Sequence, residues 1–120
     1  MSDTTNSACL TDQVRCLLVD VLQRVAFPGR EELVEQASNI SVANGPITML
    51  DLRTAATAPA SGVPDGPIPI SMVVSNPAGD AVGELLIWVA HGYLAALEFA
   101  WWIDDAPDEL PDSDRVSVTR

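Results

Sequence analysis

The chain has 120 residues, of which 48% are hydrophobic and 19% are charged. This length and balance are typical of one globular domain with a single core. Asp and Glu number 17 against 6 arginines, for a formal net charge of -11. Such a charge disfavours binding to nucleic-acid phosphates and favours attraction to a basic protein partner.

The sequence predicts neither a targeting segment nor a disulfide. Residues 1–7 are polar and lack the basic-then-apolar order of a secretory signal, and no apolar run approaches the length of a membrane span. We therefore expect a cytoplasmic protein with no membrane partner. Cys9 and Cys16 lie seven residues apart, about 10 Å along a helix, which is too far for a disulfide. Both are expected to be reduced structural thiols.

The first predicted element is a helix over residues 11–27. Thr11 is suited to be its N-cap, and Pro28-Gly29 is expected to end it. Its apolar residues recur at the three-four spacing of one helix face: Val14, Leu17, Leu18, Val21, Leu22 and Val25.

The rest of the domain has the turn-separated pattern of β-strands. Residues 54–67 contain proline, glycine and small residues without periodicity, which predicts an exposed loop. The fold class is therefore α+β, with the N-terminal helix packed on an antiparallel meander of four to five strands. Residues 1–10 are expected to be a flexible N-terminus, 11–103 the single domain, and 104–120 an acidic C-terminal segment. Strands are predicted at 33–42, 47–53, 68–75, 82–90 and 93–102.

The strongest hairpin signal joins the last two strands through His91-Gly92, a two-residue turn. A regular register then pairs Ala90 with Tyr93 and Trp88 with Ala95. One face would carry Val82, Leu86, Trp88, Tyr93, Leu97, Phe99 and Trp101. The other would carry Leu85, Ile87, Val89, Leu94, Ala96, Ala100 and Trp102. Both faces are apolar in this register, so the second needs cover from the chain itself, a second subunit or a partner.

Catalytic signatures are absent from the sequence. One histidine and two cysteines give no zinc-ligand spacing, the glycines do not form a phosphate-binding loop, and no nucleophile motif is present. We predict no metal, no cofactor and no catalytic residue, although the sequence leaves enzymatic activity open. Glu84 and Glu98 are candidate pocket carboxylates, but the regular register places them on opposite faces, where each is better suited to the rim or to pairing an arginine such as Arg53.

A partner-binding surface is predicted at the end of the hairpin. Aromatic side chains supply buried area, and neighbouring carboxylates accept arginine, a combination typical of surfaces that hold a basic protein. The alternative is a solvated acidic tail. The candidate residues are Trp88, Trp101, Trp102, Asp104, Asp105, Asp108 and Glu109.

The stretch from Gly83 to Trp101, with the pattern G-E-L-L-I-W-V-x-x-G-Y-L-x-x-L-E-x-x-W, continues into an acidic, proline-containing run from Asp104 to Pro111. It resembles the C-terminal signature of an uncharacterised family of small acidic bacterial proteins of the actinobacterial type. That family usually has an acidic residue where Ala90 or His91 stands here. The resemblance implies no activity, cofactor or catalytic residue.

Three functions remain open from the sequence. The first is a non-catalytic protein-binding module, most concretely an immunity or antitoxin-like protein whose acidic surface occludes a basic toxin such as a nuclease. The second is a small-ligand-binding protein or enzyme, with Trp88, Trp101 and Glu84 or Glu98 lining a pocket between helix and curved sheet. The third is a structural homodimer formed through the second apolar face.

Overall fold

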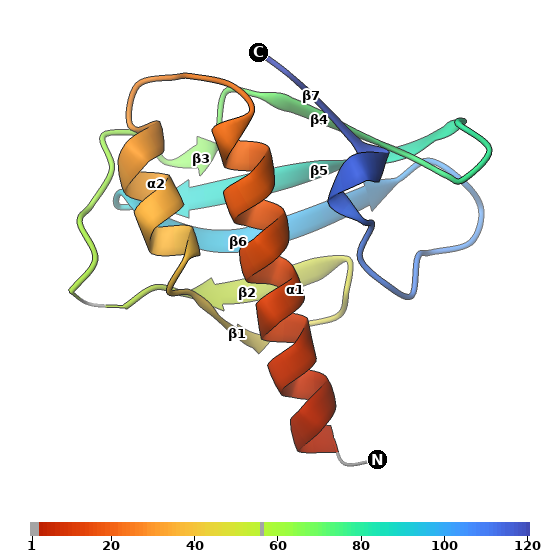
Figure 1. Ribbon diagram of the computed structural model, residues 1–120, viewed down its shortest axis with the longest axis horizontal. Coiled ribbons are helices and arrows are strands. Elements are labelled where there is room, and N and C mark those ends of the chain that lie inside the picture. The colour runs from red at the N-terminus through yellow and green to blue at the C-terminus, as the bar shows by residue number, and fades with distance from the viewer. Residues whose placement is uncertain (1–2, 56) are drawn as a thin grey trace.

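The computed structural model describes residues 3–55 and 57–120, with side chains from residue 10 onward. It confirms the α+β class: two helices and one antiparallel sheet, whose seven strands exceed the four to five predicted (Figure 1). The helices are α1 (Asp3–Gln23), α2 (Arg30–Ala37) and the short 3-10 helix η1 (Ser113–Arg115). The strands are β1 (Ser41–Asn44), β2 (Met49–Arg53), β3 (Gly66–Pro67), β4 (Ser71–Ser75), β5 (Ala81–Ala90), β6 (Tyr93–Trp101) and β7 (Val116–Thr119).

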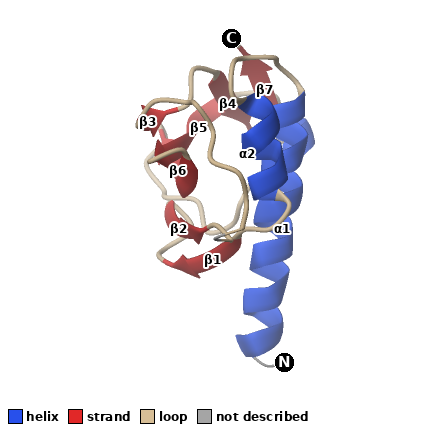
Figure 2. Cartoon of the chain, turned by 90° about the vertical axis from the view of Figure 1, so that its left-hand side faces the viewer, coloured by secondary structure: helices blue, strands red, loops and turns tan. Residues whose placement is uncertain are grey.

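The sheet is not a simple meander. Its strand order is β1-β2-β6-β5-β4-β7, and β3 pairs with β5 beyond the end of β4. The hairpin of β1 and β2 therefore joins the meander of β4, β5 and β6 through β6, while residues 116–119 of the C-terminal segment form an edge strand beside β4. Both helices lie on the same side of this sheet (Figure 2).

Helix α1 is longer at its start and shorter at its end than predicted. It begins at Asp3 rather than near residue 11, so Thr11 is not an N-cap but lies inside the helix, where its hydroxyl accepts the Val42 amide at 3.5 Å. Because residues 3–7 are polar, this extension has no apolar periodicity to reveal it. The helix ends at Gln23, before Pro28-Gly29. Phe27 lies in the turn that follows the helix, and its side chain is buried.

The strand predicted over 33–42 is wrong for its first half, which forms α2. Leu33, Gln36 and Ala37 are its buried residues, and their three-four spacing is that of a helix face. Glu31 and Glu32 lie in its first turn, where they complement the helix dipole. Only the end of the predicted strand, β1, is extended.

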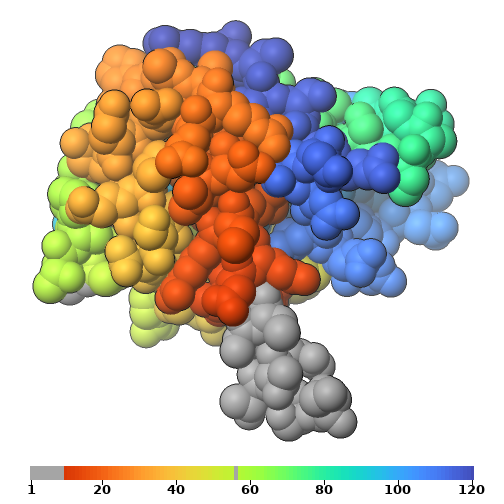
Figure 3. All heavy atoms as spheres, in the orientation of Figure 1, coloured from red at the N-terminus to blue at the C-terminus, as the bar shows by residue number. Residues whose placement is uncertain are grey.

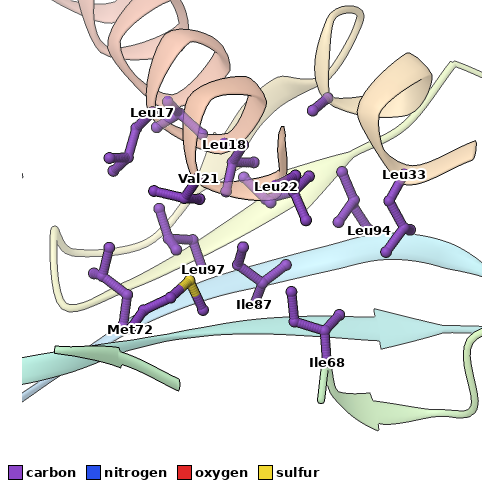
Figure 4. Close-up of a cluster of buried hydrophobic side chains, with 14 of the residues drawn as sticks. Leu17, Leu18, Val21, Leu22, Leu33, Ile68, Met72, Ile87, Leu94 and Leu97 are labelled. Atoms are coloured by element: carbon purple, nitrogen blue, oxygen red, sulfur yellow. The ribbon is translucent and has the colours of Figure 1, made fainter. Parts of the chain in front are cut away.

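The core lies between the helices and the facing side of the sheet (Figure 4). Helix α1 contributes Val14, Leu17, Leu18, Val21 and Leu22, each almost completely buried. From the sheet come alternate residues of the central strands, including Met72, Leu85, Ile87, Val89, Leu94, Leu97 and Phe99.

Residues 54–67 are not the fully exposed loop that was predicted. Ser61 and Val63 are buried, and Gly66 and Pro67 form β3. The loop is held by Gln36 of α2, whose amide nitrogen donates to the carbonyls of Pro59 and Gly92, each at 2.8 Å. The Gln36 amide oxygen accepts the Leu94 N–H at 2.9 Å. This completely buried side chain therefore joins α2, the loop and the hairpin turn.

The hairpin of β5 and β6 is confirmed, but its predicted register is wrong. His91 and Gly92 have φ of 55° and 85°, as a two-residue turn of the primed type requires. Ala90 pairs with Tyr93 as predicted, but Trp88 pairs with Ala96 instead of Ala95. One extra residue in β6 forms a bulge beside Trp88 and Val89, and every later residue of β6 moves to the opposite face.

The two faces of the hairpin therefore differ from the prediction. Leu97 and Phe99 join Leu85, Ile87 and Val89 on the buried face, whereas Ala96 and Ala100 lie on the helix-free face. We call this second side the open face. Its residues on the central strands are Val82, Glu84, Leu86, Trp88, Ala90, Tyr93, Ala96, Glu98 and Ala100, all of intermediate exposure. It is mixed rather than wholly apolar, because it carries Glu84 of β5 and because the bulge places Glu98 beside it.

Candidate functional site

The predicted partner-binding residues other than Trp88 lie at the end of β6 and in the segment that follows it. Trp101 and Trp102 are 40% and 55% exposed, and Ile103 is 50% exposed, a concentration of large apolar side chains in contact with water. Trp101 pairs with Gly83 on the helix side of the sheet, while the Trp102 N–H donates to the Val82 carbonyl at 2.8 Å and prolongs the strand pairing. The sheet thus fixes the backbone of both tryptophans.

The residues that follow form a connection that we call the acidic loop, residues 103–112. Its carboxylates at Asp104, Asp105, Asp108 and Glu109 are exposed. The loop is anchored at its far end, where Leu110 packs against the core and η1 lies beside α1 (Figure 3). The acidic loop is therefore held by the fold at both ends and is not a free tail. A loop held in this way has less conformational entropy to lose when a partner binds.

Arg24, just beyond the end of α1, holds the η1 end of the acidic loop. Its guanidinium donates to the carbonyls of Ser113 and Val116 and pairs with Asp20 at 2.9 Å. Hydrogen bonding by Ser113, and then by Arg24, holds the pKa of the Asp20 carboxyl below its usual value. A side chain 92 residues away in sequence thus holds the start of β7.

The arginines serve the fold rather than neutralising the acidic surface. Like Arg24, four others donate to backbone carbonyls: Arg15 to Ile40, Arg30 to Gln23, Arg115 to Asn76 and Arg120 to Ala26. Among the side chains that the structure describes, only Arg24–Asp20 and Arg30–Glu31 form ion pairs. The carboxylates of the acidic loop therefore have no cation within the described part of the chain.

Glu84 and Glu98 lie on the same face, contrary to the opposite faces predicted. Glu98 pairs with Leu86, and Glu84 with Ala100, so the two carboxylates are diagonal neighbours across β5 and β6. Trp88 lies on this open face too, and its indole Nε1 donates to Glu98 Oε1 at 3.0 Å. Trp88 is therefore separated from Trp101 by strand and by face, and the three tryptophans do not form one cluster.

The pocket predicted between helix and sheet is not lined by these glutamates. Packed apolar side chains fill the space between the helices and the sheet. Two open hollows instead flank the acidic loop, one against α1 and one against Phe99 and Arg115. They share Gln13, Leu110, Pro111 and Asp112, and neither contains Glu84, Glu98 or Trp88.

Within residues 3–55 and 57–120, no three His, Cys, Asp or Glu side chains are grouped so as to hold a metal ion. His91 is an exposed turn residue, and its N–H donates to the Asp65 carboxylate at 2.8 Å. Cys16 is an exposed free thiol, not a core one, and the side chain of Cys9 lies outside the described residues. No helix in the described part of the chain is both long and apolar enough to cross a membrane.

Sequence reasoning missed the residues that hold the site. Leu110, the single large apolar side chain in the acidic and proline-rich run 104–114, was a signal for an anchor, because such a residue gains most by packing on the core. Neither Arg24 nor Gln36 gave a comparable signal, since their partners are backbone carbonyls far away in sequence.

Comparisons of the chain with protein-family models, with curated proteins and with solved structures found no match.

Proposed function

We propose that this protein is a non-catalytic binding module that holds a basic protein, most concretely as an immunity or antitoxin-like protein that occludes a basic toxin such as a nuclease. The observation that carries the proposal is the set of hydrogen bonds that the arginines make. Five of the six are bound to carbonyls of the chain itself, and the acidic loop keeps exposed carboxylates without a cation.

Three features of the protein support this role. The exposed side chains of Trp101 and Trp102, just before the loop, and of Ile103 at its start offer apolar area next to the carboxylates. Its attachment at both ends preorganises the surface. The net charge of -11 accelerates the encounter with a basic partner and makes binding sensitive to salt.

The family resemblance over Gly83–Trp101 belongs to the same proposal. The resembling stretch contains the strands that position Trp101, and its continuation contains the acidic loop. We propose that the signature describes this binding end of the fold.

The test is a binding titration with the basic product of a neighbouring reading frame, at low and at high salt. The loop variant Asp104→Asn/Asp105→Asn/Asp108→Asn/Glu109→Gln should lose most of the low-salt affinity. The matched control Asp12→Asn/Glu32→Gln/Glu35→Gln/Asp80→Asn removes the same four charges elsewhere and should keep most of it. Equal losses in the two variants would refute the loop as the binding surface, and failure to bind any basic product would refute the function.

A further inference from the structure

The open face carries apolar and acidic side chains together. Leu86, Trp88 and Tyr93 form its apolar centre, half-buried within the sheet, and both helices lie on the other side (Figure 2). Around this centre are Glu84 and Glu98. Asp51 of β2 pairs with Ala96 and adds a third carboxylate to the face.

These three carboxylates have no ion-pair partner among the described side chains. Glu98 is the most constrained, because it lies between Leu86 of β5 and Met49 of β2 and accepts the Trp88 indole N–H. A single neutral donor leaves the remaining lone pairs of this carboxylate free. A carboxylate that is half-buried among apolar side chains gains from a cation that also excludes water.

Glu84 and Glu98 are diagonal neighbours, and residues in such pairs lie about 7–8 Å apart. Leu86 is next to both on the same face, opposite Glu98 and two residues after Glu84, and Trp88 is the next residue of β5 on this face. A guanidinium placed over Leu86 can donate to both carboxylates and lay its plane against the indole. An ammonium group offers neither the planar fork nor the stacking.

We infer that the open face is a docking surface for an arginine-bearing segment of the basic partner, with one guanidinium bound between Glu84 and Glu98 beside Trp88. The inference rests on the proposed function and adds a second surface to it. Charge complementarity decides the occupant. A second copy would bring another net charge of -11 and the same three carboxylates, with only Arg53 of this face to oppose them.

The test uses arginine-rich and lysine-rich peptides of equal length and charge, titrated at low salt onto the whole protein. The reporter is the Trp88 indole N–H resonance, assigned by its loss in Trp88→Phe. We expect this resonance to shift with the arginine peptide, which should bind more tightly than the lysine peptide.

Two variants separate this inference from the proposed function. Glu84→Gln/Glu98→Gln keeps an acceptor for Trp88 and should weaken the arginine peptide about tenfold or more. Glu32→Gln/Glu35→Gln on α2 removes the same charge and should change binding much less. Thermal melts of both variants verify that they fold.

The other outcomes would refute either the open-face site or the proposed function. Equal weakening by the two variants, or an unmoved Trp88 resonance, removes the open-face site, while loss of binding in the acidic-loop variant alone would leave the proposed function standing. If neither peptide binds, both proposals fail. A solution dimer whose Trp88 resonance moves with protein concentration would assign the open face to a second copy instead.

Discussion

Replacing Gln36 by leucine tests whether one buried amide holds three parts of the fold together. Gln36 is completely buried, and its side chain makes three hydrogen bonds to backbone groups. Leucine fills a similar volume but offers no donor or acceptor. The Gly92 carbonyl would keep the Ser61 N–H as a partner, whereas Leu94 N–H and the Pro59 carbonyl would each lose theirs.

The expected cost follows from these two orphaned groups. A buried group left without a partner costs about 1–3 kcal/mol, and the Pro59 carbonyl, which is only partly buried, costs less because water can reach it. Together they predict a loss of about 2–4 kcal/mol in the free energy of unfolding. For 120 residues, the unfolding entropy is about 0.25 kcal/mol/K. The melting temperature should therefore fall by about 8–16 °C.

Chemical denaturation and thermal melts measure this loss directly. The control is Gln23→Leu, an exposed glutamine at the end of α1, which should change stability by about 0.5 kcal/mol or less. Amide exchange at Leu94 should accelerate in the Gln36 variant beyond the global change. A loss below about 1 kcal/mol, or unchanged exchange at Leu94, would refute the view that the amide is a structural link.

Three further variants test the sheet and the attachment of the acidic loop. Gly83→Ala should destabilise the fold by about 1–3 kcal/mol in a urea titration, because its Cβ would lie 2.5 Å from the Ala100 carbonyl oxygen; a neutral result would mean that the strands separate easily. Deletion of Ala95, the bulged residue, should leave a cooperative melt, since it removes the bulge and keeps every later residue of β6 on its present face, and loss of the cooperative melt would contradict the register. The lowered pKa of Asp20 stabilises the folded state above about pH 4 and loses that effect as the pH falls through the folded pKa, so Asp20→Asn should reduce the acid sensitivity of unfolding; identical acid profiles would contradict it.

Elements that depend on neighbouring residues could be predicted from the sequence, whereas contacts between residues far apart in the chain could not. The turn at His91-Gly92 and the two strands beside it follow from neighbouring residues, and the structure contains them. Helix α2 was equally local, but Gln36 at a core position concealed its helical spacing until its backbone partners were known. The attachment of β7 and of the acidic loop depends on Arg24, far away in the chain, and no local pattern reports such contacts.

The position of the two glutamates shows why the register could not be read from alternation alone. Leu94 and Leu97 are three residues apart, so a regular strand cannot bury both, and the two alanines between them leave room for a bulge. A regular register would place Glu84 on one face and Glu98 on the other, forcing one carboxylate into the core. A bulge sacrifices strand hydrogen bonds worth about 1 kcal/mol each, whereas an unpaired buried carboxylate costs several kcal/mol. The bulge is therefore the lower-energy solution, and the same change of register that keeps Glu98 out of the core places it on the open face beside Glu84.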